Sequence, residues 1–161
     1  MPNIIFVCTG NTCRSVMAEA IMRREKNKLQ CDLEIVSAGL AAVEGAGATP
    51  HVRGLLAEEG IDVHAHAARN LDENMVRRAD LILVMTRQHR EWLTEEFPEA
   101  ASKTFLLKEY AGIKDDDPDI SDPFGGSWEK YRGTLEEIKK CITNIVEKLK
   151  GGNNNGNCPG L

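Results

Sequence analysis

The stretch VCTGNTCRS, residues 7–15, carries residue types that can bind an anion and attack it. Gly10 lets the backbone approach a ligand closely, and Arg14 can donate two parallel hydrogen bonds to an oxyanion such as phosphate. Cys8 supplies a thiol, and a field that holds phosphate also favours its nucleophilic thiolate form. Ser15 can stabilise that thiolate. The spacing Cys-x5-Arg-Ser therefore predicts an anion-binding turn with a nucleophile at its base.

The elements on either side indicate where this turn lies. Residues 4–7 form a short apolar run that is typical of a buried parallel strand, and the residues after Ser15 have the apolar spacing of a helix. Backbone N–H groups at a strand-to-helix turn form an anion cradle together with the helix dipole. Cys8, at the end of the strand, would lie at the bottom of that cradle.

Strands and helices alternate along the chain and predict one α/β domain. A length of 161 residues suits a single core. The alternation predicts a three-layer, doubly wound sandwich with a central parallel sheet of about four strands, in which ligands bind at the carboxyl ends of strands. We expect the domain to span residues 1–150 and the low-complexity tail 151–161 to be disordered. The predicted strands are residues 4–7, 33–37, 81–85 and 104–107, and the predicted helices are residues 15–29, 50–60, 72–78, 86–97 and 128–150, with a long loop over 108–127.

Composition limits the possible functions. The chain has 42% apolar and 28% charged residues, as ordinary globular proteins do. Its formal net charge of −5 argues against a partner that is nucleic acid or an anionic membrane. We find no signal peptide or membrane span, which predicts a cytoplasmic protein. The five cysteines, an odd number without the spacing of a disulfide scaffold, favour reduced thiols.

Other interpretations of the Cys8 stretch fit less well. A nucleotide-binding P-loop would need a second glycine followed by Lys-Ser or Lys-Thr. A metal site would need more ligands than the thiols of Cys8 and Cys13, so we expect no metal. Cys8 could be a small buried residue that ends a strand, but the presence of Arg14 and Ser15 favours a nucleophile.

The stretch CTGNTCRS resembles the phosphate-binding loop of the low-molecular-weight protein tyrosine phosphatases. The similarity continues in order with SAG at 37–39, ADLILVMT at 79–86 and DPFGG at 122–126. Several phosphatase folds share the Cys-x5-Arg signature, whereas its N-terminal position combined with a late Asp-Pro is much more specific to this family. The resemblance implies the low-molecular-weight phosphatase fold and a monomeric enzyme that acts on phosphorylated protein substrates without a cofactor.

The resemblance also implies a role for each matching residue. Cys8 would be the nucleophile that forms a phosphocysteine, Arg14 would bind the phosphoryl oxygens, and Asp122 would be the general acid and then the base that activates water. Asn11, Ser15 and Ser37 would brace the loop. The expected substrate-binding residues are Thr9, Gly10, Asn11, Thr12, Cys13, Ser15 and Phe124.

Asp122 lies in a loop that is rich in aspartate. We expect the first four aspartates of this loop to form a solvated acidic surface. Asp122 precedes a proline, as Asp117 also does, and proline restricts the backbone of the residue before it and so fixes the direction of its carboxylate. Sequence alone does not single out Asp122; the resemblance to the family does. The four others are Asp115, Asp116, Asp117 and Asp119.

Thr12 stands where tyrosine phosphatases of this family commonly carry isoleucine. Threonine has a similar outline, but its hydroxyl makes this side of the substrate pocket polar. The segment LAAV at 40–43 lacks the aromatic that often flanks phosphotyrosine, and Phe124 stands alone where the family often has two aromatics. A planar, polar phosphoguanidinium would suit this altered pocket. Bacterial protein-arginine phosphatases of this fold share CTGNTCRS and DPFGG, together with ATPH at 48–51 and LKEY at 107–110. We therefore expect a protein-arginine phosphatase, with a tyrosine phosphatase as the alternative.

Cys13 is a candidate redox partner of Cys8. A disulfide between them could protect the nucleophile and switch the enzyme off reversibly. An inert thiol at position 13 is the alternative. His64 and His66 could form a metal pair, but we expect exposed loop histidines.

Two further functions remain more distant. Thioredoxin-coupled arsenate reductases share this fold but need another cysteine pair after the third strand, where TRQHREWLTEE at 86–96 has none. A non-catalytic phosphopeptide-binding module would not need both Cys8 and Asp122.

Overall fold

Four parallel strands form the sheet at the centre of the computed structural model. Their order is β2-β1-β3-β4, and all three pairings are parallel, which confirms the predicted architecture. The structure describes residues 1–151 and 161. The tail that we predicted to be disordered, residues 151–161, therefore lies outside the described residues except for its first and last residue. Gly151 still belongs to the last helix. The strands are β1 (Asn3–Cys8), β2 (Glu34–Gly39), β3 (Leu81–Val84) and β4 (Thr104–Leu106).

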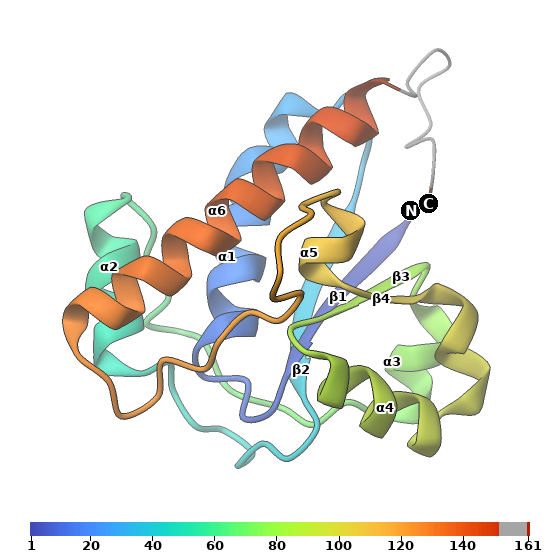
Figure 1. Cartoon of the computed structure of the whole chain (residues 1–161), viewed down its shortest axis with the longest axis horizontal. Helices are drawn as coiled ribbons and strands as arrows, with labels where there is room; N and C mark the ends of the chain where they lie inside the picture. Colours follow the sequence, from blue (N-terminus) through green and yellow to red (C-terminus); the bar gives the residue numbers. More distant parts are fainter. Residues whose placement is uncertain (152–160) are drawn as a thin grey trace.

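Helices cover both faces of the sheet and complete the three layers (Figure 1). Ile4, Phe6 and Cys8 pack into one core and Ile5 and Val7 into the other, because successive side chains of a strand point to opposite faces. No helix among the described residues is long and apolar enough to cross a membrane. The first core is covered by α1 (Arg14–Glu25), α2 (Pro50–Glu58) and α6 (Trp128–Gly151), and the second by α3 (Glu73–Arg78) and α4 (Arg87–Glu96).

Local signals place the helix starts correctly. Thr49, Asp72 and Thr86 each accept a hydrogen bond from the backbone N–H three residues later, and Pro50 occupies the first turn of α2. The predicted loop over 108–127 begins too early, because Leu107–Tyr110 forms the short helix α5. Two short 3-10 helices, Lys26–Lys28 and Pro98–Lys103, complete the fold.

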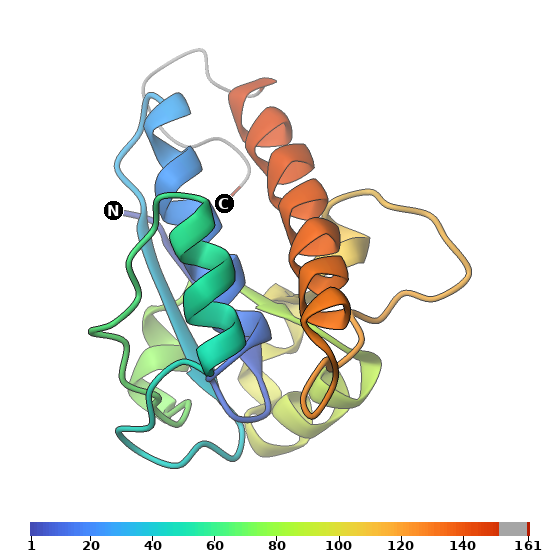
Figure 2. The same cartoon turned by 90° about the vertical axis from the view of Figure 1, so that its left-hand side faces the viewer.

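The turn after β1 lies between segments that are distant in the sequence. In both views the blue turn after β1, the cyan segment after β2 and the orange segment before α6 lie at the lower end of the molecule (Figure 2). β1 lies between β2 and β3, so the chain leaves β1 toward one side of the sheet and later returns to the other. Such a switch point is where α/β sheets bind ligands.

Candidate active site

A cavity of about 210 Å³ opens at the carboxyl end of β1. Cys8 ends the strand and is only 3% exposed, and α1 begins at Arg14, so the intervening turn forms the wall between them. The residues that line the cavity are Cys8, Thr9, Gly10, Thr12, Cys13, Arg14, Asp122 and Phe124. The structure thus gathers the three predicted catalytic residues and most of the predicted substrate-binding residues around one space.

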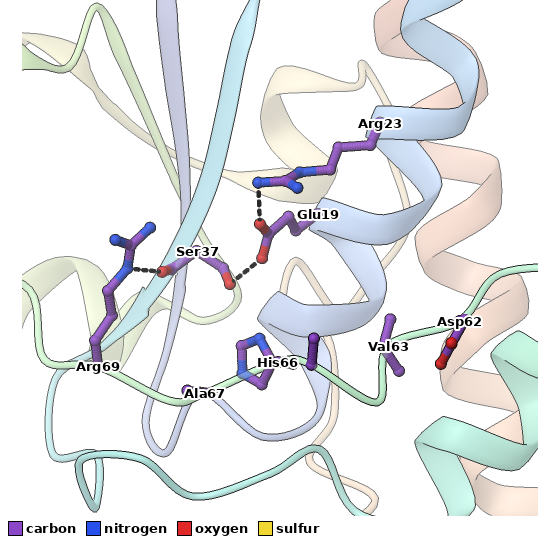
Figure 3. Close-up of a pocket in the computed structure, with 9 residues that line it drawn as sticks. Glu19, Arg23, Ser37, Asp62, Val63, His66, Ala67 and Arg69 are labelled. Carbon is purple, nitrogen blue, oxygen red and sulfur yellow. Dashed lines mark hydrogen bonds and ion pairs between the residues drawn. The ribbon is translucent and has the colours of Figure 1, made fainter.

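Hydrogen bonds behind the turn hold the hydroxyl that contacts the nucleophile. The amide nitrogen of Asn11 donates to the hydroxyl oxygens of Ser15 and Ser37, at 2.9 Å each. Both hydroxyls are therefore acceptors toward Asn11 and must donate their own protons elsewhere. Ser37 donates to Glu19 (Figure 3), and the Oγ of Ser15 lies 3.0 Å from the Sγ of Cys8. The hydroxyl of Ser15 can therefore donate to the Cys8 sulfur.

Asn11 adopts the left-handed conformation, with φ of 54°, and its other polar groups are also occupied. Its side-chain oxygen accepts from the backbone N–H of Arg69 at 3.1 Å. Its carbonyl oxygen lies 2.7 Å from the Nε2 of His66, which must donate this bond. Figure 3 shows His66 beside the Glu19 and Ser37 pair. His66 is half-buried, which corrects the expectation that both histidines of this loop are exposed; only His64 is.

The backbone after β2 supports the nucleophile from a second side. The N–H of Leu40 donates to the carbonyl of Cys8 at 3.0 Å, and the N–H of Ala41 donates to that of Thr9 at 2.9 Å. A Cβ at Gly39 would lie 2.6 Å from the Thr9 carbonyl, so only glycine permits this approach. The SAG motif therefore brings the second strand against the phosphate-binding turn.

Arg14 and Asp122 face each other across the cavity. The Arg14 side chain is 5% exposed and its Nη2 lies 3.5 Å from the Oδ2 of Asp122, whose side chain is 51% exposed. The Nη1 of Arg14 donates to the carbonyl of Ile120 at 2.9 Å. Asp122 also accepts a bond from the N–H of Phe124 at 3.0 Å, across the proline. The cavity thus holds one buried cation and one accessible carboxylate close to the Cys8 thiol.

His89 lies beneath the turn and was not predicted as part of the site. Its Nε2 lies 2.8 Å from the Oγ1 of Thr9, and the side chain is 5% exposed. Burial and the nearby charge of Arg14 lower the pKa of His89 to about 4, so the ring is neutral at pH 7. A neutral ring can hold Thr9 without adding charge to the phosphate cradle.

A family model for low molecular weight phosphotyrosine protein phosphatases matches residues 3–155. The chain belongs to this family. A protein-arginine-phosphatase of Geobacillus stearothermophilus is 43% identical over 91% of this chain and 95% of its own length. The low molecular weight protein-tyrosine-phosphatase Wzb of Escherichia coli K12 is 36% identical over 91% of this chain and 95% of its own length.

A solved structure gives a further match to this low molecular weight phosphatase. It is a cysteine-to-serine mutant of YwlE arginine phosphatase with a phosphorylated active-site serine. It superposes with a TM-score of 0.86 at 38% identity and covers 92% of this chain and 95% of its own. The predicted family and fold are therefore confirmed.

The acidic loop of this phosphatase is more ordered than its composition indicates. Asp115 pairs with Lys108 at 3.2 Å, and Asp119 accepts a bond from the backbone N–H of Arg87 at 2.9 Å. Asp117 accepts from the N–H of Asp119 at 3.0 Å. Asp115, Asp116 and Asp117 are exposed, as expected for a solvated acidic surface, although Asp115 also pairs with Lys108. Asp119 differs, because it is half-buried and is bound by Arg87, 32 residues away in the sequence.

The cysteines of the phosphatase differ in state. Among the described residues, Cys8, Cys13 and Cys141 are free thiols. The pKa of Cys13 is raised to about 12, chiefly by burial and then by the charges of Cys8 and Asp122. Cys31 is disulfide-bonded, so the expectation of reduced thiols is wrong for it. Its pairing needs two Cα atoms within about 7 Å, which spacing along a sequence does not reveal. Cys158 lies outside the described residues.

Among the described residues, no group of three or more His, Cys, Asp or Glu side chains is arranged to hold a metal ion. His64 and His66 in particular make different contacts. The backbone N–H of His64 bonds to Asp62, whereas the His66 ring holds Asn11.

Proposed function

We propose that this member of the family hydrolyses phosphoarginine in proteins through a phosphocysteine intermediate. The observation that carries the proposal is the Cys8 thiol, 3.0 Å from the Ser15 hydroxyl, in the cavity that Arg14 and Asp122 also line. We assign the phosphatase domain to residues 1–150, acting as a monomer because one chain supplies the whole cavity. The family consists of protein phosphatases, which act on phosphorylated protein substrates.

In the first step the Cys8 thiolate attacks phosphorus. An S–P bond forms, the P–N bond to the guanidino group breaks, and Asp122 gives its proton to the departing nitrogen. Arg14 and the backbone N–H groups of the turn bind the phosphoryl oxygens as negative charge builds on them.

In the second step water attacks phosphorus of the phosphocysteine. The Asp122 carboxylate takes a proton from this water, the S–P bond breaks, and inorganic phosphate leaves. The sulfur departs as thiolate, and the hydroxyl of Ser15 is placed to stabilise it. The three catalytic side chains of both steps, Cys8, Arg14 and Asp122, line one cavity, and Ser15 contacts the sulfur from behind it.

Thr12 and Phe124 are the basis of the proposed arginine specificity. Thr12 lines the cavity, and its carbonyl is held by the N–H of Thr49 at 3.1 Å. Phe124 lines the mouth and its side chain is 74% exposed, with Gly125 and Gly126 after it. A single aromatic ring and a hydroxyl group in the lining of one cavity suit a planar cation whose nitrogens donate hydrogen bonds. The 43% identity to a protein-arginine-phosphatase supports the same specificity.

A tyrosine phosphatase is the second candidate function. The exposed ring of Phe124 could also stack on a phosphotyrosine ring, and Wzb is 36% identical. The same three catalytic residues would then act on a phosphate ester instead of a phosphoramidate.

Trapping of the intermediate tests the catalytic proposal. We expect Cys8→Ser incubated with a phosphoarginine peptide to lose turnover and to gain one phosphoryl group on residue 8, detected by mass spectrometry of the peptide that contains it. Cys8→Ala should lose turnover and remain unmodified. Full hydrolysis by either variant would rule out a cysteine nucleophile, and binding without turnover by the unmutated protein would indicate a phosphopeptide-binding module.

A further inference from the structure

Lys108 is a buried ammonium group that the mechanism above does not use. It lies in the first turn of α5, within the LKEY sequence, and is 4% exposed. Its Nζ donates to the carbonyl of Asp117 at 2.9 Å and lies 3.2 Å from carboxylate oxygens of Asp115 and of Glu137 on α6. An ammonium has three N–H donors, so these three acceptors satisfy it completely.

The surroundings keep Lys108 charged. Burial is the strongest single influence on its pKa and acts to lower it, but the hydrogen bonds and charges of Glu137 and Asp115 outweigh burial and raise the pKa. Removing one member of a buried ion pair leaves the remaining charges without compensation. The buried ammonium therefore joins the backbone of the acidic loop to α6, through carboxylates that are themselves about half exposed.

The loop that Lys108 holds leads directly to Asp122. After Asp117 the loop is attached again at Asp119, through Arg87, and at Ile120, whose N–H donates to a carbonyl at the end of β3. The half-exposed side chain of Asp122 is held directly by Arg14, at 3.5 Å, and by the N–H of Phe124, at 3.0 Å. These contacts orient the carboxylate, while the part of the loop that precedes Asp122 sets where its backbone lies.

We propose that Lys108 is a positioning residue for Asp122, whose buried ammonium keeps the acidic loop where the carboxylate can reach the leaving group. This inference rests on the proposed role of Asp122 as general acid. Without the ammonium, the loop would lose its bond at the Asp117 carbonyl and its link to Glu137 on α6. Repulsion between the half-exposed carboxylates of Asp115 and Glu137 would add only a weak, water-screened force. The phosphate cradle would be unaffected, because β1, β2 and α1 build it.

The dependence of rate on the leaving group separates this role from a general loss of stability. Lys108→Met keeps the length of the side chain and removes its charge. The parameter to measure is kcat/KM, which reports on steps up to the first phosphoryl transfer. Phenyl phosphate needs a proton on its leaving group, whereas 2,4-dinitrophenyl phosphate does not. Because general acid catalysis contributes about 10²–10⁴-fold, we expect kcat/KM to fall ~10-fold or more for phenyl phosphate and to change little for the dinitrophenyl ester.

Matched variants complete the experiment. Lys108→Arg retains a cation and should restore most of the activity on phenyl phosphate, while Lys114→Met, at an exposed lysine of the same loop, should behave as wild type. Inhibition by inorganic phosphate, which reports on the cradle, should be the same in all three. If Lys108→Met does not fold, Glu137→Gln should give the same selective loss in smaller measure.

Two outcomes would overturn the proposal for Lys108. One is an equal loss of kcat/KM on both aryl phosphates, and the other is no loss on either. A failure of the proposed function would look different, because the unmutated protein would then show no turnover that depends on Cys8 with any aryl phosphate.

Discussion

The Nη2 of Arg14, in the first turn of α1, lies 3.5 Å from the Oδ2 of Asp122, in the loop before α6. This contact joins a phosphate-binding group and an acid–base group that are far apart in the sequence. A phosphoryl group bound to Arg14 would share the guanidinium with Asp122. The carboxyl group would then be held beside the phosphoryl group, where the leaving nitrogen has to be protonated.

Replacing Asp122 by asparagine should remove the acid and base while keeping the shape of the side chain. We expect kcat/KM for phenyl phosphate to fall about 10²-fold or more, because general acid catalysis typically contributes at least this factor to the rate. Asp116→Asn is the matched control, since Asp116 is exposed in the same loop. Stopped-flow or steady-state phosphate release would measure both, and equal rates for the two variants would exclude Asp122 as the acid.

Gly39→Ala should damage both stability and activity. Its Cβ would lie 2.6 Å from the Thr9 carbonyl and 3.0 Å from the Cβ of Ala42, so the turn beside Cys8 must shift. We expect a loss of about 1–3 kcal/mol in the free energy of unfolding, together with lower kcat. Gly47→Ala has no atom within 4 Å of its new Cβ and should be close to wild type. Urea denaturation that does not distinguish the two variants would contradict the close approach.

His89 should make the protein less stable in acid. Its pKa is lowered from 6.5 to about 4 in the folded state, chiefly by burial, so the unfolded state binds a proton first as the pH falls. Stability from this residue is therefore fully present above pH 6.5 and is lost between pH 6.5 and 4, by about 3 kcal/mol in total.

Urea denaturation at several pH values tests this effect. The decrease in unfolding free energy between pH 7 and 4.5 should be smaller in His89→Asn than in wild type, whereas His64→Asn, at an exposed histidine, should retain the full decrease. An identical pH dependence in wild type and His89→Asn would show that another group is responsible.

Cys13 should act as the resolving thiol when Cys8 is oxidised. Its raised pKa, about 12, keeps it protonated at pH 7, so peroxide should not oxidise Cys13 directly. Cys13 must lose its proton before it can attack an oxidised Cys8, so we expect disulfide formation to be slow at pH 7 and faster at higher pH. Peroxide inactivation of wild type should reverse with dithiothreitol, and that of Cys13→Ser should become irreversible. Equal recovery of both proteins would leave Cys13 as an inert thiol.

The sequence predicted the fold and the base of the site because their signals are local. The apolar run before Cys8, the capping residues Thr49 and Thr86, and the Cys-x5-Arg spacing each act over a few residues. Asp122 is different, because Asp117 in the same loop is also followed by a proline, and the resemblance of DPFGG to the family singled it out. Interactions within one turn or one motif can be identified without knowing the tertiary structure.

The supporting residues could not be predicted in the same way. His66 reaches Asn11 and His89 reaches Thr9 only after the sheet has assembled, since their sequence separations are 55 and 80 residues. Lys108 was assigned to a loop because helix α5 is only four residues long, too short for an apolar period to be visible. These residues hold the catalytic groups in place, and only the packed structure shows their contacts.

The most direct test of the account measures phosphate release from matched phosphoarginine and phosphotyrosine peptides, with Cys8→Ala as the blank. We predict a strong preference of wild type for phosphoarginine. Thr12→Ile should shift the preference toward phosphotyrosine, and Thr12→Val, which removes the hydroxyl with little change of shape, should lower activity on phosphoarginine. A preference of wild type for phosphotyrosine, with no shift in either Thr12 variant, would contradict the arginine specificity and leave a tyrosine phosphatase.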